Sequence, residues 1–173
     1  MRKRVVVAAL ALVAAMVGSV AVAGSALADS HGDLTVRNAA TGKCLQPKDG
    51  SYADGVPIVQ VTCNGNAVQR WDFVDYDDHR FVVWNAATLK CMDAAGLNKN
   101  GTPIIQWPCG GSLTNLMFQA SRDLPGYVSL KSRVSNTSTH CIDVPGGLAT
   151  EGAEMRLWAC NDTASQTFGA FHP

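Results

Sequence analysis

Six cysteines have the clearest potential chemistry in this sequence, and they form pairs of nearly constant spacing. The second member follows the first by 18 or 19 residues, at Cys44 and Cys63, Cys91 and Cys109, and Cys141 and Cys160. In an exported chain, an even number of cysteines favours disulfides over a reactive thiol. A metal site is disfavoured because the pairs lack C-x-x-C spacing and only one histidine, His140, lies near any cysteine.

The start of the chain has the pattern of an export signal. Three basic residues at 2–4 precede an uninterrupted apolar run over 5–17, and positions 26–28 offer a small-x-small cleavage site. This pattern predicts a signal peptide over residues 1–28 and a secreted, extracellular domain over 29–173. Because the apolar run is long, an uncleaved membrane anchor remains an alternative.

Charge and motifs narrow the classes of function. The chain has 14 basic and 14 acidic residues, and removing the basic leader leaves a slightly acidic domain, so we expect neither nucleic acid nor anionic membranes as partners. Motifs such as G-x-S-x-G and H-E-x-x-H are absent, and the four histidines are scattered. The acids Asp75, Asp77 and Asp78 lack the spacing of a calcium loop and indicate a solvated turn. The sequence therefore predicts no catalytic residue, metal site or cofactor.

Internal repeats determine the expected architecture. Three related segments begin at Val36, Val83 and Val134, with the sequences VRNAATGKCLQ, VWNAATLKCMD and VSNTSTHCID. Each repeat has a turn signal between its cysteines and few helix-forming residues, which predicts an all-β protein made of hairpins. Although six cysteines permit 15 pairings, three equivalent units most simply close three equivalent loops within the repeats. We place the repeats at about 34–80, 81–130 and 131–173.

A closing motif follows the second cysteine of each repeat at a constant offset of six. Each copy ends in a large apolar side chain expected in a shared core, in Gln69-Arg70-Trp71, Asn115-Leu116-Met117 and Gln166-Thr167-Phe168. Together with the N-x(5-6)-C-[LIM]-[DQ] opening, this pattern resembles the ricin B-chain type β-trefoil over residues 36–171. The second copy departs from Q-x-W, where Phe118 is the alternative apolar filler. The resemblance implies three four-stranded repeats with pseudo-threefold symmetry, six strands closing a barrel and six capping it.

The same resemblance implies one shallow sugar pocket in each repeat. Its members use an Asp two residues after the first cysteine and an aromatic residue two before the second. These positions are Gln46 and Val61 in the first repeat, Asp93 and Trp107 in the second, and Asp143 and Trp158 in the third. A carboxylate accepts hydrogen bonds from two sugar hydroxyls, and an indole stacks on the apolar face of a pyranose. We therefore expect the first pocket to be inactive and the other two to bind sugar.

Strand alternation separates the two remaining pockets. In the third repeat Met155 and Leu157 alternate with Arg156 and Trp158, which predicts that Trp158 stands on the polar face beside Arg156. Around Trp107 both faces are mixed, so packing in the core remains an alternative for that ring. For both acids, hydrogen bonding in a turn remains the alternative. The polar ligands that the resemblance implies beside this pair are poorly matched. In the third repeat Arg156 and Asn161, which directly follows the second cysteine, are the candidates that compensate in part for them.

These observations favour a secreted, monomeric, lectin-like protein without catalysis. The resemblance implies a carbohydrate partner with a galactose-, xylose- or arabinose-type unit. The poorly matched polar ligands leave a second hypothesis from another class: a protein-interaction module with degenerate pockets, such as a protease inhibitor or a toxin delivery subunit. A glycan-degrading enzyme would require turnover by the single domain, for which the sequence offers no catalytic group.

Overall fold

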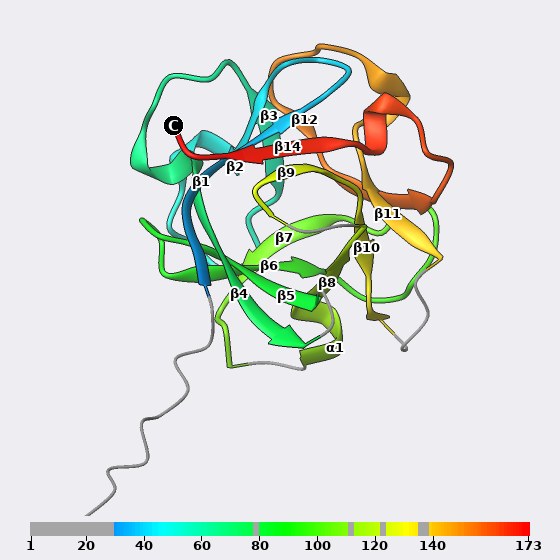
Figure 1. Ribbon diagram of the computed structural model, residues 1–173, viewed down its shortest axis with the longest axis horizontal. Coiled ribbons are helices and arrows are strands. Elements are labelled where there is room, and N and C mark those ends of the chain that lie inside the picture. Colours follow the sequence, from blue (N-terminus) through cyan, green and yellow to red (C-terminus); the bar gives the residue numbers. More distant parts are fainter. Residues whose placement is uncertain (1–29, 78–79, 111–112, 122–123, 135–138) are drawn as a thin grey trace, which may run out of the picture.

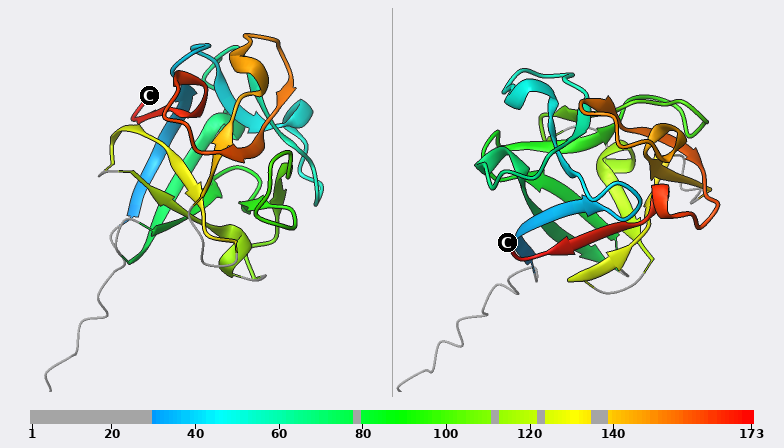
Figure 2. Two further views of the ribbon diagram at one scale, coloured as in Figure 1. Left: turned by 90° about the vertical axis from the view of Figure 1, so that its right-hand side faces the viewer. Right: turned by 90° about the horizontal axis from the view of Figure 1, so that it is seen from above.

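A computed structural model describes residues 30–77, 80–110, 113–121, 124–134 and 139–173 (Figures 1 and 2). The expected signal peptide over 1–28 lies outside these residues. The described part is an all-β fold whose helical segments are single turns. Its strands are β1 (Ser30–Asn38), β2 (Cys44–Pro47), β3 (Ile58–Val61), β4 (Arg70–Asp77), β5 (Arg80–Asn85), β6 (Lys90–Ala94), β7 (Ile104–Trp107), β8 (Met117–Ala120), β9 (Gly126–Val128), β10 (Leu130–Ser132), β11 (His140–Asp143), β12 (Ala153–Glu154), β13 (Arg156–Ala159) and β14 (Phe168–Phe171).

Short helical turns connect several of these strands. The turns are η1 (Lys48–Gly50), η2 (Ala67–Gln69), α1 (Leu113–Leu116), η4 (Pro145–Gly147) and η5 (Ala164–Gln166). Both η2 and η5 lead directly into the last strand of a repeat. In the second repeat α1 takes their place ahead of β8, and it carries an additional residue.

The strand order repeats along the chain, as the sequence predicts. Strands β1 to β4 form the first repeat and β5 to β8 the second, while β9 to β14 form the third. The described chain has 14 strands in place of the expected twelve, because two strands of the third repeat are each divided into two segments, at Ser129 and at Met155. Strand β12 pairs with β3 of the first repeat, whereas β13 pairs with β11, so the chain changes partner at Met155.

A circuit of antiparallel strands surrounds the core. Strand β1 pairs with β4, β4 with β5, β5 with β8 and β8 with β10, and on the other side β1 pairs with β14 and β14 with β9. The circuit is interrupted between β9 and β10, which flank Ser129. The sequence predicts a closed barrel, but the ring of hydrogen-bonded strands is not closed at this point. Figure 1 shows β14, in red, lying beside β1, in blue.

Each repeat also carries a hairpin that begins at its first cysteine: β2–β3, β6–β7 and β11–β13. The predicted turn glycines Gly55, Gly101 and Gly152 have φ values of 75°, 85° and 75°, which a residue with a side chain rarely adopts. Bridges within the repeats join Cys44 to Cys63, Cys91 to Cys109 and Cys141 to Cys160. The predicted pairing is thereby confirmed, and each bridge contributes about 3 kcal/mol for a loop of this size.

The register of the last strands corrects one expectation about the core. Trp71 lies opposite Leu34, and Phe118 lies opposite Phe81. Leu34 and Phe81 occupy equivalent positions, because each stands four residues before the buried asparagine that opens its repeat motif. Phe118 is therefore the equivalent of Trp71 and is fully buried, as is Phe168 in the third repeat. The closing motif of the second repeat is Leu116-x-Phe118, one residue later than the constant offset predicts. The side chain of Met117 lies outside the described residues.

Buried amides join the first repeat to both of the others. The Nδ2 of Asn38 donates to the backbone oxygens of Ser165 and Thr167 at 3.0 and 3.3 Å, linking the first repeat to the third. The Nδ2 of Asn85 donates to the carbonyl of Val68 at 2.8 Å, linking the second repeat to the first. Gln60 adds a second link from the first repeat to the third, through the carbonyl of Leu148 at 2.7 Å. These contacts hold the three hairpins in fixed relative positions.

Candidate functional site

The hairpins place each candidate acid and its aromatic partner on one face. In β6 and β7, Asp93 lies opposite Ile105 and Cys91 lies opposite Trp107. Because side chains alternate along a strand, Asp93 and Trp107 share the outer face, while Met92 and its neighbours on the other face are buried in the core. In β11 and β13 the equivalent pairs are Asp143 with Arg156 and Cys141 with Trp158. The residue opposite the acid is therefore the main difference between the two sites.

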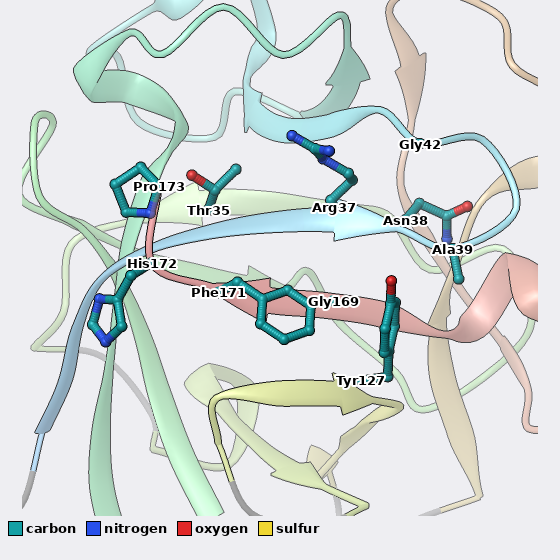
Figure 3. Close-up of a pocket in the computed structure, with 10 residues that line it drawn as sticks. All are labelled: Thr35, Arg37, Asn38, Ala39, Gly42, Tyr127, Gly169, Phe171, His172 and Pro173. Carbon is teal, nitrogen blue, oxygen red and sulfur yellow. The ribbon is translucent and has the colours of Figure 1, made fainter.

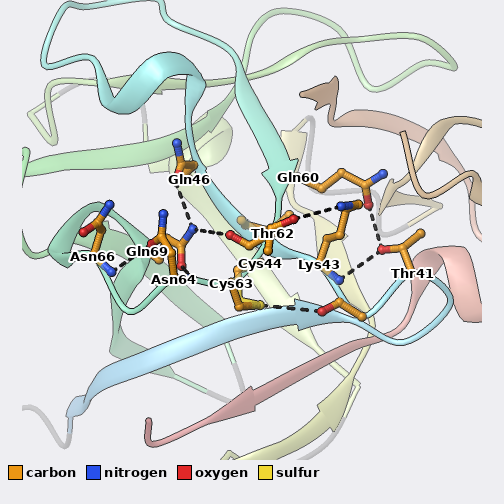
Figure 4. The surroundings of a disulfide bond; sticks show 12 residues. Thr41, Lys43, Cys44, Gln46, Gln60, Thr62, Cys63, Asn64, Asn66 and Gln69 are labelled. Carbon is orange, nitrogen blue, oxygen red and sulfur yellow. Dashed lines mark hydrogen bonds between the residues drawn. A yellow bond between two sulfur atoms is a disulfide. The ribbon is translucent and has the colours of Figure 1, made fainter. Parts of the chain in front are cut away.

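The first-repeat position is filled by an internal hydrogen bond. Gln46 is buried, and its Oε1 accepts a hydrogen bond from Nε2 of Gln69 at 3.0 Å (Figure 4). Gln69 also donates to the carbonyl of Thr62 at 3.2 Å and accepts from the backbone N–H of Asn64 at 2.9 Å. The side chain opposite Gln46 is Val59, which is buried. This site thus has neither a free acceptor nor an aromatic platform, as the sequence predicts.

In the third repeat an arginine joins the acid to the indole. The Nε of Arg156 donates to Oδ1 of Asp143 at 3.0 Å, and its guanidinium carbon lies 4.1 Å from the centroid of the Trp158 ring. Asp143 is only 4% exposed, and Trp158 is half-buried. The predicted alternation holds, since Met155 and Leu157 are buried on the opposite face. The guanidinium nevertheless neutralises the acid and covers the ring face that a sugar would use.

All four predicted residues of the third repeat line one hollow of about 420 Å³. Its wall includes Asp143, Arg156, Trp158 and Asn161, together with the backbone of η4. The Oδ1 of Asn161 accepts hydrogen bonds from the backbone N–H and the hydroxyl of Thr163, at 3.2 and 2.7 Å. The structure therefore brings these predicted ligands together, but most of their polar atoms already have partners within the protein.

The second repeat has the free acid and the exposed ring. Asp93 is 8% exposed and forms no hydrogen bond or ion pair with any residue of the described ranges. Burial raises the pKa of its carboxyl above the ordinary aspartate value. Trp107 is 44% exposed, and a Cβ added at Gly55 would lie 3.5 Å from its ring, so the indole rests on the turn of the first repeat.

This geometry reverses the order expected from strand alternation. Trp107, for which core packing was an alternative, is the more exposed ring, whereas the Trp158 face is covered by Arg156. The shifted closing motif of the second repeat also leaves its acid without the glutamine that stands near the equivalent position in the other two repeats. Leu116 stands where Gln69 and Gln166 stand in the other repeats, and a leucine has no amide to offer to Asp93. A buried carboxylate without a partner is a physical mark of a binding site.

Other functional chemistry has little support in the described part of the chain. Residues 30–77, 80–110, 113–121, 124–134 and 139–173 contain no group of three or more His, Cys, Asp or Glu side chains that could hold a metal ion. Within the same ranges, no helix is long and apolar enough to cross a bilayer. Of the acidic cluster near Tyr76, the Asp77 side chain and all of Asp78 lie outside the described residues.

Comparison with known proteins agrees with the strand order and the hairpins. Residues 25–107 match a family model described as a ricin-type β-trefoil lectin domain-like family. The chain has a β-trefoil fold, and its residues 25–107 are similar to ricin-type lectin-like domains. The match ends at Trp107 and covers the first repeat and most of the hairpin of the second, while the third repeat follows from the internal repetition of the chain. No curated protein matches the chain in sequence.

Solved structures share the trefoil fold at low sequence identity. A designed threefold-symmetric protein, ThreeFoil, has a TM-score of 0.71 and 22% identity over 79% of this chain and 96% of its own. An exo-β-1,3-galactanase from Clostridium thermocellum has a TM-score of 0.73 and 24% identity, over 82% of this chain but only 30% of its own. A Macrolepiota procera ricin B-like lectin, solved with lactose, has a TM-score of 0.66 and 16% identity over 86% and 99% of the two chains.

Sequence reasoning missed two features of the trefoil. The absence of a glutamine partner for Asp93 depends on the one-residue shift before β8, which the cysteine spacing does not reveal. A pair of exposed aromatic rings, Tyr127 and Phe171, also went unnoticed, because they belong to strands far apart in the chain. The only sequence signal for them was a tyrosine and a phenylalanine outside any repeat motif.

Proposed function

We propose that this β-trefoil is a secreted, non-catalytic carbohydrate-binding protein whose principal pocket lies in the second repeat. The observation that carries the proposal is the carboxylate of Asp93, which has no partner among the described residues and lies on the same hairpin face as the exposed indole of Trp107. The lectin-like family match and the lectin neighbours support carbohydrate binding in general. The expected ligand is a neutral galactose-, xylose- or arabinose-type unit.

The chemistry of the pocket suits a neutral sugar. Hydroxyl groups of the sugar donate to the Asp93 carboxylate and supply the hydrogen bonds that the protein itself does not provide. The apolar C–H face of the ring stacks on Trp107 and removes exposed indole area from water. Sugar binding thus relieves the cost of burying the Asp93 carboxylate, which an unliganded protein bears without compensation.

The third repeat is expected to bind more weakly. A sugar that bonds to Asp143 competes with Nε of Arg156, and a sugar that stacks on Trp158 displaces the guanidinium from the ring. An open single pocket has a Kd on the order of 0.1 to 1 mM, about 4 to 5.5 kcal/mol. Binding of two sites to one polymer would raise the apparent affinity.

A glycan array followed by calorimetry tests the proposal. We expect Trp107→Ala and Asp93→Ala each to weaken binding of the best oligosaccharide at least tenfold, because one removes the stacking surface and the other the acceptor. Trp158→Ala and Asp143→Ala are the matched variants of the third repeat and should have smaller effects. Gln46→Ala, at the equivalent position of the inactive first repeat, is the neutral control.

Two outcomes would contradict the proposal. If the protein binds no sugar on the array, the covered third pocket and the inactive first one instead favour a protein-interaction module. If it binds sugar but Asp93→Ala and Trp107→Ala bind as well as the parent, the pocket lies elsewhere. Turnover of an oligosaccharide by the purified domain would contradict the non-catalytic part.

A further inference from the structure

A second hollow lies away from all three hairpins, on the outer face of β1, β14 and β9. It has a volume of about 310 Å³ and is lined by Thr35, Arg37, Asn38, Ala39, Gly42, Tyr127, Gly169, Phe171, His172 and Pro173 (Figure 3). Val36, Phe168, Ala170 and Val128 alternate with these positions and are buried on the inner face. The hollow therefore belongs to the strand circuit and not to any repeat pocket.

Two aromatic rings and a glycine shape this hollow. Gly169 lies opposite Tyr127 on one side and opposite Arg37 on the other. The rings of Tyr127 and Phe171 meet edge to face with centroids 5.3 Å apart. A Cβ added at Gly169 would lie 2.7 Å from the Phe171 ring and 3.0 Å from the Tyr127 ring, so only glycine lets both rings fold over the strand.

The rings remain open to solvent even though they contact each other. Tyr127 is 56% exposed and Phe171 is 43% exposed. In Figure 3 the Tyr127 hydroxyl points toward the end of β1 that carries Asn38. Each of these rings walls the hollow with an apolar face of the kind on which a pyranose stacks.

The charge of this hollow is opposite to that of the repeat pockets. Arg37 is exposed and forms no ion pair or side-chain hydrogen bond with any described residue. None of the described residues that line the hollow is acidic, whereas Asp143 lines the hollow of the third repeat and Asp93 occupies the equivalent position of the second. A guanidinium fork binds a carboxylate through two parallel hydrogen bonds, and a neighbouring acid would oppose such a ligand.

We propose that Arg37, Tyr127 and Phe171 form a binding site for a hexuronate unit of an acidic polysaccharide. The ring of the uronate stacks on the face of one of the two aromatic rings and contacts the other, and its carboxylate pairs with the guanidinium of Arg37. The floor at Gly169 allows the sugar to approach the backbone of β14. This site is independent of the pocket proposed in the second repeat, because it selects an anionic sugar whereas that pocket selects a neutral one.

The test uses the full chain and two matched probes, trigalacturonic acid and neutral galactotriose. We expect trigalacturonic acid to shift the NMR amide resonance of Gly169, and galactotriose to leave it in place. By calorimetry, Arg37→Gln and Tyr127→Ala should each raise the Kd for trigalacturonic acid at least tenfold. Tyr76→Ala removes an equally exposed tyrosine outside the hollow and should have no effect. Added salt should weaken binding.

Three results would overturn the proposed uronate site. The first is a Gly169 resonance that does not respond to trigalacturonic acid. The second is an equally large shift of that resonance with galactotriose or inorganic phosphate, and the third is an Arg37→Gln variant that binds trigalacturonic acid as tightly as the parent. Because Arg37 and Tyr127 are exposed, both variants should fold, and a thermal melt verifies this. Trp107→Ala separates the two proposals: it should weaken neutral-sugar binding at least tenfold and leave the uronate affinity unchanged, so each proposal can fail alone.

Discussion

At the scale of single residues, the side chain opposite the acid decides the state of each pocket. Asp143 lies opposite Arg156 and is neutralised by it, whereas Asp93 lies opposite Ile105 and has no partner in the described part of the chain. The two acids are equally placed on their hairpins. A single cross-strand neighbour therefore separates a self-paired pocket from one that is ready to accept hydrogen bonds.

The raised pKa of Asp93 predicts how stability changes with pH. Burial makes the folded protein hold this proton more tightly than the unfolded chain, whose pKa is near the ordinary value of 3.8. Stability from this group is therefore present at acid pH and is lost as the pH rises through 3.8 to the higher folded pKa. We expect Asp93→Asn to raise the Tm at neutral pH, with the difference vanishing in acid.

Thermal melts of both proteins between pH 3 and pH 8 measure this difference. Asp143→Asn serves as the comparison because its acid is paired with Arg156, so it should lower the Tm at neutral pH. A Tm for Asp93→Asn equal to or below that of the parent at pH 7 would show that the carboxylate has a stabilising partner.

At the scale of elements, a glutamine ties the loop after the second cysteine to the last strand. The Oε1 of Gln69 accepts from the N–H of Asn64, and the Oε1 of Gln166 accepts from the N–H of Asn161, both at 2.9 Å. In the second repeat Leu116 takes the place of the glutamine, and its side chain has no oxygen that could accept a hydrogen bond from the N–H of Gly110.

This difference predicts the rate of amide hydrogen exchange in the three loops. The N–H groups of Asn64 and Asn161 should exchange slowly because they are hydrogen bonded, whereas the N–H of Gly110 should exchange at least tenfold faster. Exchange followed by NMR measures all three in one sample. Equal protection of the three amides would mean that another group replaces the missing glutamine.

The sequence predicts local features of these elements well. The cysteine spacing gives the hairpins and their bridges, because each loop closes within about 20 residues. A constant offset from the second cysteine misplaces the closing motif of the second repeat by one residue, because α1 adds a residue between Cys109 and β8. Alternation places Arg156 and Trp158 on one face but does not reveal that residues two apart on that face can cover each other.

At the scale of the whole molecule, buried amides connect the first repeat to the other two. Asn38 links the first repeat to the third, whereas Asn85 and Gln106 both link the second repeat to the first, Gln106 through the carbonyl of Ser51 at 2.8 Å. These amides therefore form a chain of contacts centred on the first repeat and close no cycle. The contacts of Asn38 join segments more than 120 residues apart in the chain. Such long-range partners leave no trace in local spacing, which is also why the hollow at β1, β14 and β9 was not predicted.

Asn38→Ala should destabilise the whole trefoil. The change leaves carbonyl groups of η5 without their donor and removes the acceptor for the N–H groups of Ala40 and Thr41, so we expect a loss of about 2 to 4 kcal/mol. Chemical denaturation measures this loss. Asn66→Ala removes an exposed asparagine and is the neutral control. A loss below that seen for Asn66→Ala would mean that the link between the first and third repeats is not needed.

The pairing of β1 with β14 has a consequence for rearranging the chain. Thr35 lies directly opposite Phe171, so a short peptide that connects residue 173 to residue 30 spans neighbouring strands and leaves their register intact. New ends can then be opened at the glycine turn of any one of the three hairpins. Circularly permuted versions of the molecule thereby become a direct means of asking which repeat folds first.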